Sequence, residues 1–145
     1  MGDGRWIQQP PDPVEVSSAV WTAEPAGLAQ LSLLRGQLRG LVAGRSRAPG
    51  TERDDGDRLL LVFEELASNG LRHGQPPVRA VVVTLPCGWL VEISDAAVDE
   101  SPEPAVGRDA AHGGMGLFLV ARLSDAHGWV VHDGRKIVWA RIDIA

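Results

Sequence analysis

The stretch from Leu59 to Gly74, LLLVFEELASNGLRHG, constrains the fold of this chain most, because its apolar and polar side chains separate at helical spacing. The apolar residues that would form one face of a helix are Leu59, Val62, Phe63, Leu66 and Ala67. Glu65, Asn69 and His73 stand at i, i+4 and i+8 and project from another flank. The pattern predicts an amphipathic helix with a buried face and a polar ridge.

The polar ridge has two interpretations. Side chains such as Glu65, Asn69 and His73 on the outer flank of a helix are often no more than solvated surface. A carboxylate and an amide one turn apart also form an oxygen-rich pair, which suits a hard cation or a water molecule that must lose a proton. The helix alone leaves both interpretations open, and its neighbours in the chain bear on the choice.

The remaining elements follow from changes of hydrophobic period. Strands are predicted within residues 14–23 and at residues 78–85, 89–94, 129–132 and 136–144. Helices are predicted at residues 26–43 and 117–126, beside the central one. Asp54, Asp55 and Asp57 precede the central helix, where their charges favour the positive end of its dipole. Short turns at residues 86–88 and 133–134 predict two hairpins.

These elements predict a single fold class. Hairpins imply a mostly antiparallel, mixed sheet, and the amphipathic helices need one face of that sheet to cover, which gives a two-layer α/β sandwich of the α+β type. Residues 1–13 contain several prolines and glycines and are predicted to be a flexible leader, while residues 14–145 form the domain. A chain of 145 residues fits one domain of this kind.

The segment after Asp95 is long and without hydrophobic pattern, which predicts a lid or binding loop, with disorder as the alternative. It ends at Gly114-Met115-Gly116, where glycines would let a ligand approach the backbone and the helix start would attract phosphate. A plain flexible turn explains the same glycines. Asp95 itself either ends a strand in a turn or accepts a hydrogen bond from an adenine amino group, which would distinguish adenine from guanine.

Composition excludes several classes of function. The net charge of -5 argues against a general nucleic-acid binder and leaves basic protein partners open. Cys87 is the single cysteine, so a thiolate metal cluster is excluded and a reducing compartment is the simpler expectation. The first twenty residues lack the pattern of a signal peptide, and no apolar run could span a bilayer. The sequence therefore predicts a soluble, cytoplasmic protein that binds neither membrane nor nucleic acid directly.

Taken in order, these motifs resemble the ATPase domain shared by gyrase, heat-shock chaperones, histidine kinases and MutL, known as the Bergerat fold. Within it the chain resembles the small anti-sigma factor serine/threonine kinases of bacterial partner-switching systems. Residues 65–74, ELASNGLRHG, resemble their N box, and Ser94-Asp95 with Pro102 resembles their first glycine box. Residues 114–120, GMGLFLV, resemble the second glycine box, and residues 134–140, GRKIVWA, the closing strand.

The resemblance implies ATP and Mg²⁺ as cofactors. Asn69 would ligate the magnesium that bridges the phosphates, and Glu65 would be the general base that acts on the attacking hydroxyl. Asp95 would bind adenine. The implied nucleotide contacts along the two glycine boxes and the lid are Ala97, Gly114, Met115, Gly116 and Leu117, with Arg108 or His112 as cationic helpers. His73 would either point toward phosphate or complete the helix, and its position at the helix end favours the second role.

Two positions depart from the family pattern. Relatives have a glycine where Ala97 stands, and many have a hydroxyl residue where Ile137 stands. The resemblance implies a regulatory kinase that holds a sigma factor inactive or phosphorylates a serine of an anti-sigma factor antagonist, and relatives of this kind form homodimers. Glu65 favours this activity. Ala97 and Ile137 favour the alternative, a module that keeps the fold as a protein-binding surface without catalysis.

Overall fold

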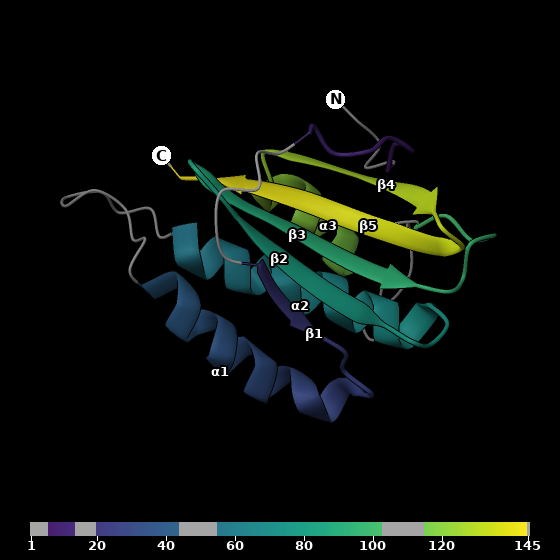
Figure 1. Ribbon diagram of the computed structural model, residues 1–145, viewed down its shortest axis with the longest axis horizontal. Coiled ribbons are helices and arrows are strands. Elements are labelled where there is room, and N and C mark those ends of the chain that lie inside the picture. Colours follow the sequence, from purple (N-terminus) through teal and green to yellow (C-terminus); the bar gives the residue numbers. More distant parts are fainter. Residues whose placement is uncertain (1–5, 14–19, 44–54, 103–114, 145) are drawn as a thin grey trace.

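The computed structural model describes residues 6–13, 20–43, 55–102 and 115–144. Its centre is an open sheet of five strands in the order β1-β2-β3-β5-β4, and each neighbouring pair is antiparallel (Figure 1). The strands are β1 (Val20–Ala23), β2 (Arg79–Leu85), β3 (Gly88–Asp95), β4 (Ala126–His132) and β5 (Arg135–Asp143). The predicted strands are therefore all present, with ends that differ by a few residues.

Both predicted hairpins are present, and turn chemistry explains them. β2 and β3 are joined through Pro86 and Cys87, with Leu85 paired to Gly88. β4 and β5 are joined through Asp133 and Gly134, whose φ angles are 50° and 72°. Two successive positive φ angles define the type I′ turn, which matches the right-handed twist of a hairpin and favours Asp-Gly.

Helices cover one face of the sheet and form the second layer (Figure 1). The helical elements are η1 (Leu28–Gln30), α1 (Leu31–Val42), α2 (Asp55–His73) and α3 (Met115–Leu123). The helix α2 packs against β3 and β5, while α1 and α3 pack against α2. The predicted two-layer sandwich is confirmed, and α2 is the element on which the layers meet.

The apolar face predicted for α2 forms the centre of the hydrophobic core. Leu59, Val62 and Phe63 are completely buried, and Leu66 is 1% exposed. Burying a side chain of this size contributes about 1.5–3 kcal/mol, so this face alone supplies a large part of the driving force for packing α2 on the sheet.

The first turn of α2 is held by a buried ion pair. Asp55 was predicted to precede the helix, and the structure places it as the first helical residue, fully buried. The Arg58 guanidinium lies 2.9 Å from the Asp55 carboxylate and also donates to the Leu123 and Asp143 carbonyl oxygens. Arg58 therefore ties α2 to the end of α3 and to β5.

The N-terminal segment differs from the sequence prediction. A flexible leader was predicted over residues 1–13, but within the described part Trp6 is only 4% exposed and packs against His127 in a tilted arrangement, with ring centroids 4.5 Å apart. Gln9 donates its N–H to the Trp129 carbonyl, and the Trp139 indole N–H donates to the Gln9 carbonyl. This segment is anchored because one aromatic side chain fills a site at the sheet edge.

Candidate active site

The start of α3 lies directly against Glu65. A Cβ atom added to Gly116 would stand 2.2 Å from Glu65 Oε2 and 3.2 Å from its Cδ. A side chain at this position would displace the Glu65 carboxylate, which is the flexible end of its side chain, because real Cβ contacts are far longer. Gly116 and Glu65, about fifty residues apart in the chain, are thus brought together.

The other end of α2 lies against Asp95. A Cβ atom added to Gly74 would stand 2.6 Å from both Asp95 Cγ and Oδ2. Gly70, one turn earlier, has more space, since an added Cβ would meet side-chain carbons of Ile93 at 3.2 Å and Val78 at 3.5 Å. These two glycines let the end of α2 pack closely on β3, which places the Asp95 carboxylate beside the helix end.

The Asp95 carboxylate is 2% exposed and is oriented by backbone donors. Its Oδ1 accepts the Ala97 N–H at 2.7 Å and the Gln75 N–H at 3.4 Å. Its Oδ2 lies 3.7 Å from the Lys136 ammonium. Ala97, the departure from the family glycine, is buried and contributes its N–H to the orientation of Asp95.

Sequence reasoning did not assign Lys136 to the site and noted only Ile137 on this strand, where many relatives have a hydroxyl residue. The strand register pairs Asp95 with Lys136 and Ser94 with Ile137. Because directly paired residues point to the same face of a sheet and successive ones alternate, Lys136 shares the face of Asp95 and Ile137 does not. The missed signal was a lone lysine at the start of a buried strand, the chain's one residue of that type.

The environment of Glu65 suits a base. Partial burial raises the pKa of its carboxyl above the ordinary glutamate value, the neighbouring Glu64 charge raises that pKa further, and Arg72 lowers it. A raised pKa makes the carboxylate a stronger proton acceptor near neutral pH. Burial and a neighbouring like charge are also the usual means by which enzymes raise the pKa of a catalytic carboxyl group.

The length of α2 separates the two ends of the site. Glu65 and Gly74 are nine residues apart, which corresponds to about 14 Å along a helix. Asn69 stands one turn from Glu65 on the same flank and is half-buried. His73 is the last residue of α2 and is exposed, a position where an imidazolium would complement the helix dipole.

Several predicted residues receive no test from the structure. Arg108, His112 and Gly114 lie outside the described residues, and so does the Met115 side chain. Leu117 is 1% exposed, and its side chain packs in the hydrophobic core. Within the described ranges no three His, Cys, Asp or Glu side chains group together as a metal site. Mg²⁺ bound through nucleotide phosphates needs only one or two protein oxygens.

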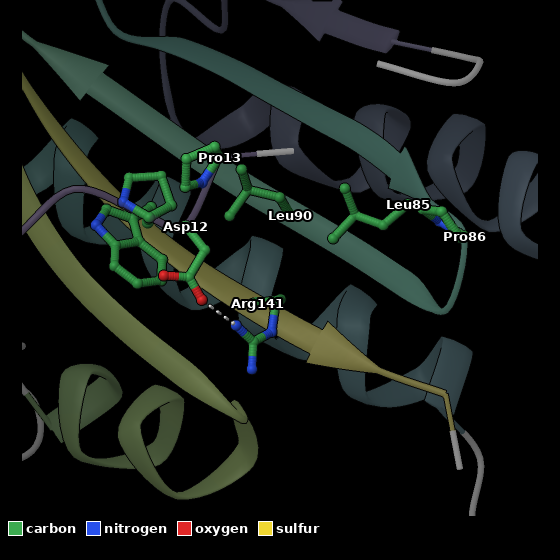
Figure 2. A pocket seen from close by; sticks show the side chains of 8 residues that line it. Asp12, Pro13, Leu85, Pro86, Leu90 and Arg141 are labelled. Carbon is green, nitrogen blue, oxygen red and sulfur yellow. Dashed lines mark hydrogen bonds and ion pairs between the residues drawn. The ribbon is translucent and has the colours of Figure 1, made fainter. Parts of the chain in front are cut away.

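The described part of the chain also has a pocket on the outer face of the sheet, of about 320 Å³ (Figure 2). Leu90 and Trp139 contribute to it from β3 and β5, and the N-terminal residues 11–13 form another part of its lining. Arg141 on its rim pairs with Asp12 at 3.5 Å. This pocket includes none of the predicted site residues, and sequence reasoning did not anticipate it.

The fold and the site together define a class, the ATP-binding domains of the Bergerat type. Its features here are an antiparallel sheet with helices on one face, a helix that carries a glutamate and an asparagine, a carboxylate at a strand end and a glycine at a helix start. The particular family follows from comparison. The family model of the histidine kinase-like ATPase domain matches residues 25–142, and the chain belongs to this family. This membership indicates an ATP-binding domain with a regulatory role.

Among curated proteins, none matches the chain. In the described part, no helix is long and apolar enough to cross a membrane.

Proposed function

We propose that this protein is a serine/threonine kinase of a bacterial partner-switching system, which binds Mg-ATP and phosphorylates a serine of an anti-sigma factor antagonist. The single observation that carries the proposal is the contact between Gly116 and Glu65. It brings a carboxylate with a raised pKa to the start of a helix, where backbone N–H groups favour phosphate.

The residues present fit a magnesium-bound nucleotide. Asp95 offers a carboxylate oxygen, Oδ2, to the base at one end of α2, while Asn69 offers an amide oxygen to the metal near the other. Gly116 leaves open the space that a side chain would fill. When bound, Mg²⁺ neutralises charge on the transferring phosphoryl group.

Glu65 is the proposed general base, which takes the proton of the attacking serine hydroxyl. Its raised pKa favours that role, and Gly116 leaves space for its carboxylate at the start of α3. The sign of the pH dependence follows, because only the ionised form accepts a proton. Transfer should rise with pH through the raised pKa of Glu65 and then level off.

The test is transfer of phosphate from Mg-ATP to a serine-bearing antagonist protein of the sulphate-transporter/anti-sigma-antagonist type. Glu65→Gln should lower the rate about 10²–10⁴-fold while ATP binding is kept. Glu64→Gln is the comparison variant: Glu64 pairs with Arg35 at 3.2 Å on the α1 side, and removing its charge should lower the pKa of Glu65 without abolishing transfer. Equal rates for wild type and Glu65→Gln would remove Glu65 from this role.

A second candidate is a protein-binding module without catalysis. The burial of Asp95, at 2% exposed with a cation beside it, favours this candidate because the carboxylate is closed off from a ligand in this structure. A thermal shift with Mg-ATP separates the two functions. A ligand at 100 times its dissociation constant adds about 2.7 kcal/mol to the unfolding free energy, so the absence of any shift would favour the module. A pull-down would then identify the sigma factor or antagonist that it binds.

A further inference from the structure

The buried lysine beside Asp95 has no role in the activity proposed above. Lys136 is the chain's single lysine and is 6% exposed. Lysine is almost never buried to this degree unless it is paired, and an uncompensated ammonium at such a site would lose several kcal/mol of hydration. Its position therefore requires fixed partners, which the structure provides.

Within the described ranges, the partners of Lys136 use only part of its hydrogen-bonding capacity. Its ammonium has three donors. One donates to the Glu100 carbonyl at 3.0 Å, and the nearest carboxylate atom, Asp95 Oδ2, lies at 3.7 Å, beyond hydrogen-bond range. Among the described residues, Oδ2 receives no hydrogen bond, in contrast to Oδ1. A cationic donor and an anionic acceptor thus stand side by side with free capacity on each.

From this pair we infer that the base site accepts purines with an oxygen at C6, guanine and hypoxanthine, as well as adenine with its C6 amino group. The inference rests on the proposed function, because it concerns the same nucleotide site. A carboxylate alone accepts an N–H and repels a carbonyl oxygen, so it selects adenine. With Lys136 beside it, the amino group of adenine meets Asp95 Oδ2, and the oxygen of guanine meets the Lys136 ammonium.

Binding of a C6 oxygen exchanges one hydrogen-bond acceptor of Lys136 for another. To bind a C6 oxygen, the Lys136 ammonium replaces the Glu100 carbonyl with another carbonyl and keeps its ion pair with Asp95. The Glu100 carbonyl, on an exposed residue, then pairs with water, and the C6 oxygen has a donor, so the strong rejection that an unpaired buried acceptor causes does not arise. The low exposure of Lys136 and Asp95 strengthens their hydrogen bonds to a base, since a buried region has a low dielectric constant.

The burial of Asp95 implies a small movement on binding. Because this carboxylate is 2% exposed, a base reaches it only when the neighbouring turn, residues 96–102, shifts. The bond from Lys136 to the Glu100 carbonyl is one contact that holds this turn against β5. When the lysine changes partner, the turn loses this contact and keeps the bonds from the Ala96 N–H to the Gln75 carbonyl and from the Ala97 N–H to Asp95.

The test compares the affinities of Mg-ATP, Mg-ITP and Mg-GTP by calorimetry. Wild type should bind ITP and GTP within about tenfold of ATP. Lys136→Met should weaken both relative to ATP by about 10- to 100-fold, the range for loss of one charge-assisted hydrogen bond, and Lys136→Arg should restore the wild-type ratio. Arg135→Met is the matched control, since it also removes one positive charge but contacts Ser94 and the Pro77 carbonyl.

The outcomes separate this inference from the proposed function. Tight ATP binding with GTP and ITP rejected more than 1,000-fold by wild type would overturn the inference alone, whether or not Lys136→Met folds. An unchanged ratio in a folded Lys136→Met variant would do the same. If wild type binds none of the three nucleotides, the proposed function fails together with the inference.

A labelling measurement gives a second readout that does not use affinity. The chain has one lysine side chain, so amine modification followed by mass spectrometry reports on Lys136 directly, apart from the N-terminal amine. GTP and ITP should slow modification of Lys136 at least as strongly as ATP does. Protection by ATP alone would contradict the shared purine site.

Discussion

Gly74 provides the sharpest test of how α2 and β3 meet. A methyl group at this position would lie 2.6 Å from Asp95 Cγ, from Asp95 Oδ2 and from the Gly70 carbonyl oxygen. Each separation is about 1 Å shorter than the distance at which carbon atoms attract. The carboxylate cannot simply turn away, because the Ala97 N–H and the Lys136 ammonium hold it.

The magnitude follows from two opposing effects. Overpacking of a tight site costs about 1–3 kcal/mol. Replacing glycine by alanine stabilises by about 0.4–1 kcal/mol through the unfolded chain. Gly74→Ala should therefore lower the free energy of unfolding by about 1–2 kcal/mol. For a domain of this length about 1 kcal/mol corresponds to roughly 4 °C in Tm, so the expected loss is roughly 4–8 °C.

Gly36 supplies the matched control for the same chemical change. It lies inside α1, is exposed, and a Cβ atom there would meet nothing within 4 Å. Gly36→Ala should raise stability by about 0.5–1 kcal/mol because alanine is the better helix former. Urea unfolding of both variants measures the change in the free energy of unfolding, which should be a loss for Gly74→Ala and a gain for Gly36→Ala. A Gly74→Ala variant as stable as Gly36→Ala would refute the close contact between α2 and Asp95.

Two further predictions concern stability. Glu65 holds its proton more tightly when folded than when unfolded, so its contribution to stability falls as pH rises from the ordinary glutamate pKa through its raised pKa. Thermal unfolding without ligand should therefore show Glu65→Gln to be more stable than wild type at pH 7. A stability difference that persists unchanged below pH 4 would show that the raised pKa of Glu65 is not its cause. Trp6→Ala should cost about 3 kcal/mol in urea unfolding, because the buried indole leaves a cavity, whereas Ile7→Ala, at a side chain 60% exposed, should change stability by less than about 0.5 kcal/mol. Equal effects of the two substitutions would mean that the N-terminal segment is not anchored by Trp6.

The sequence alone determined the elements, their order and the fold class. The helical period of residues 59–74 placed the buried face of α2 correctly, because that face is set by local spacing and by the hydrophobicity of a few side chains. Asp133-Gly134 determined the hairpin of β4 and β5, because these two residues favour the positive φ angles of a type I′ turn. The ordered motifs also indicated the ATPase family to which the chain belongs.

Only the tertiary structure decided which residues face one another. The register of β3 and β5 placed Lys136, not Ile137, beside Asp95, and a shift of one residue reverses every side chain between the faces of a sheet. The anchoring of Trp6 against His127 joins segments about 120 residues apart. Local pattern does not encode such contacts, because they depend on the shape of the space that the other elements leave when they pack.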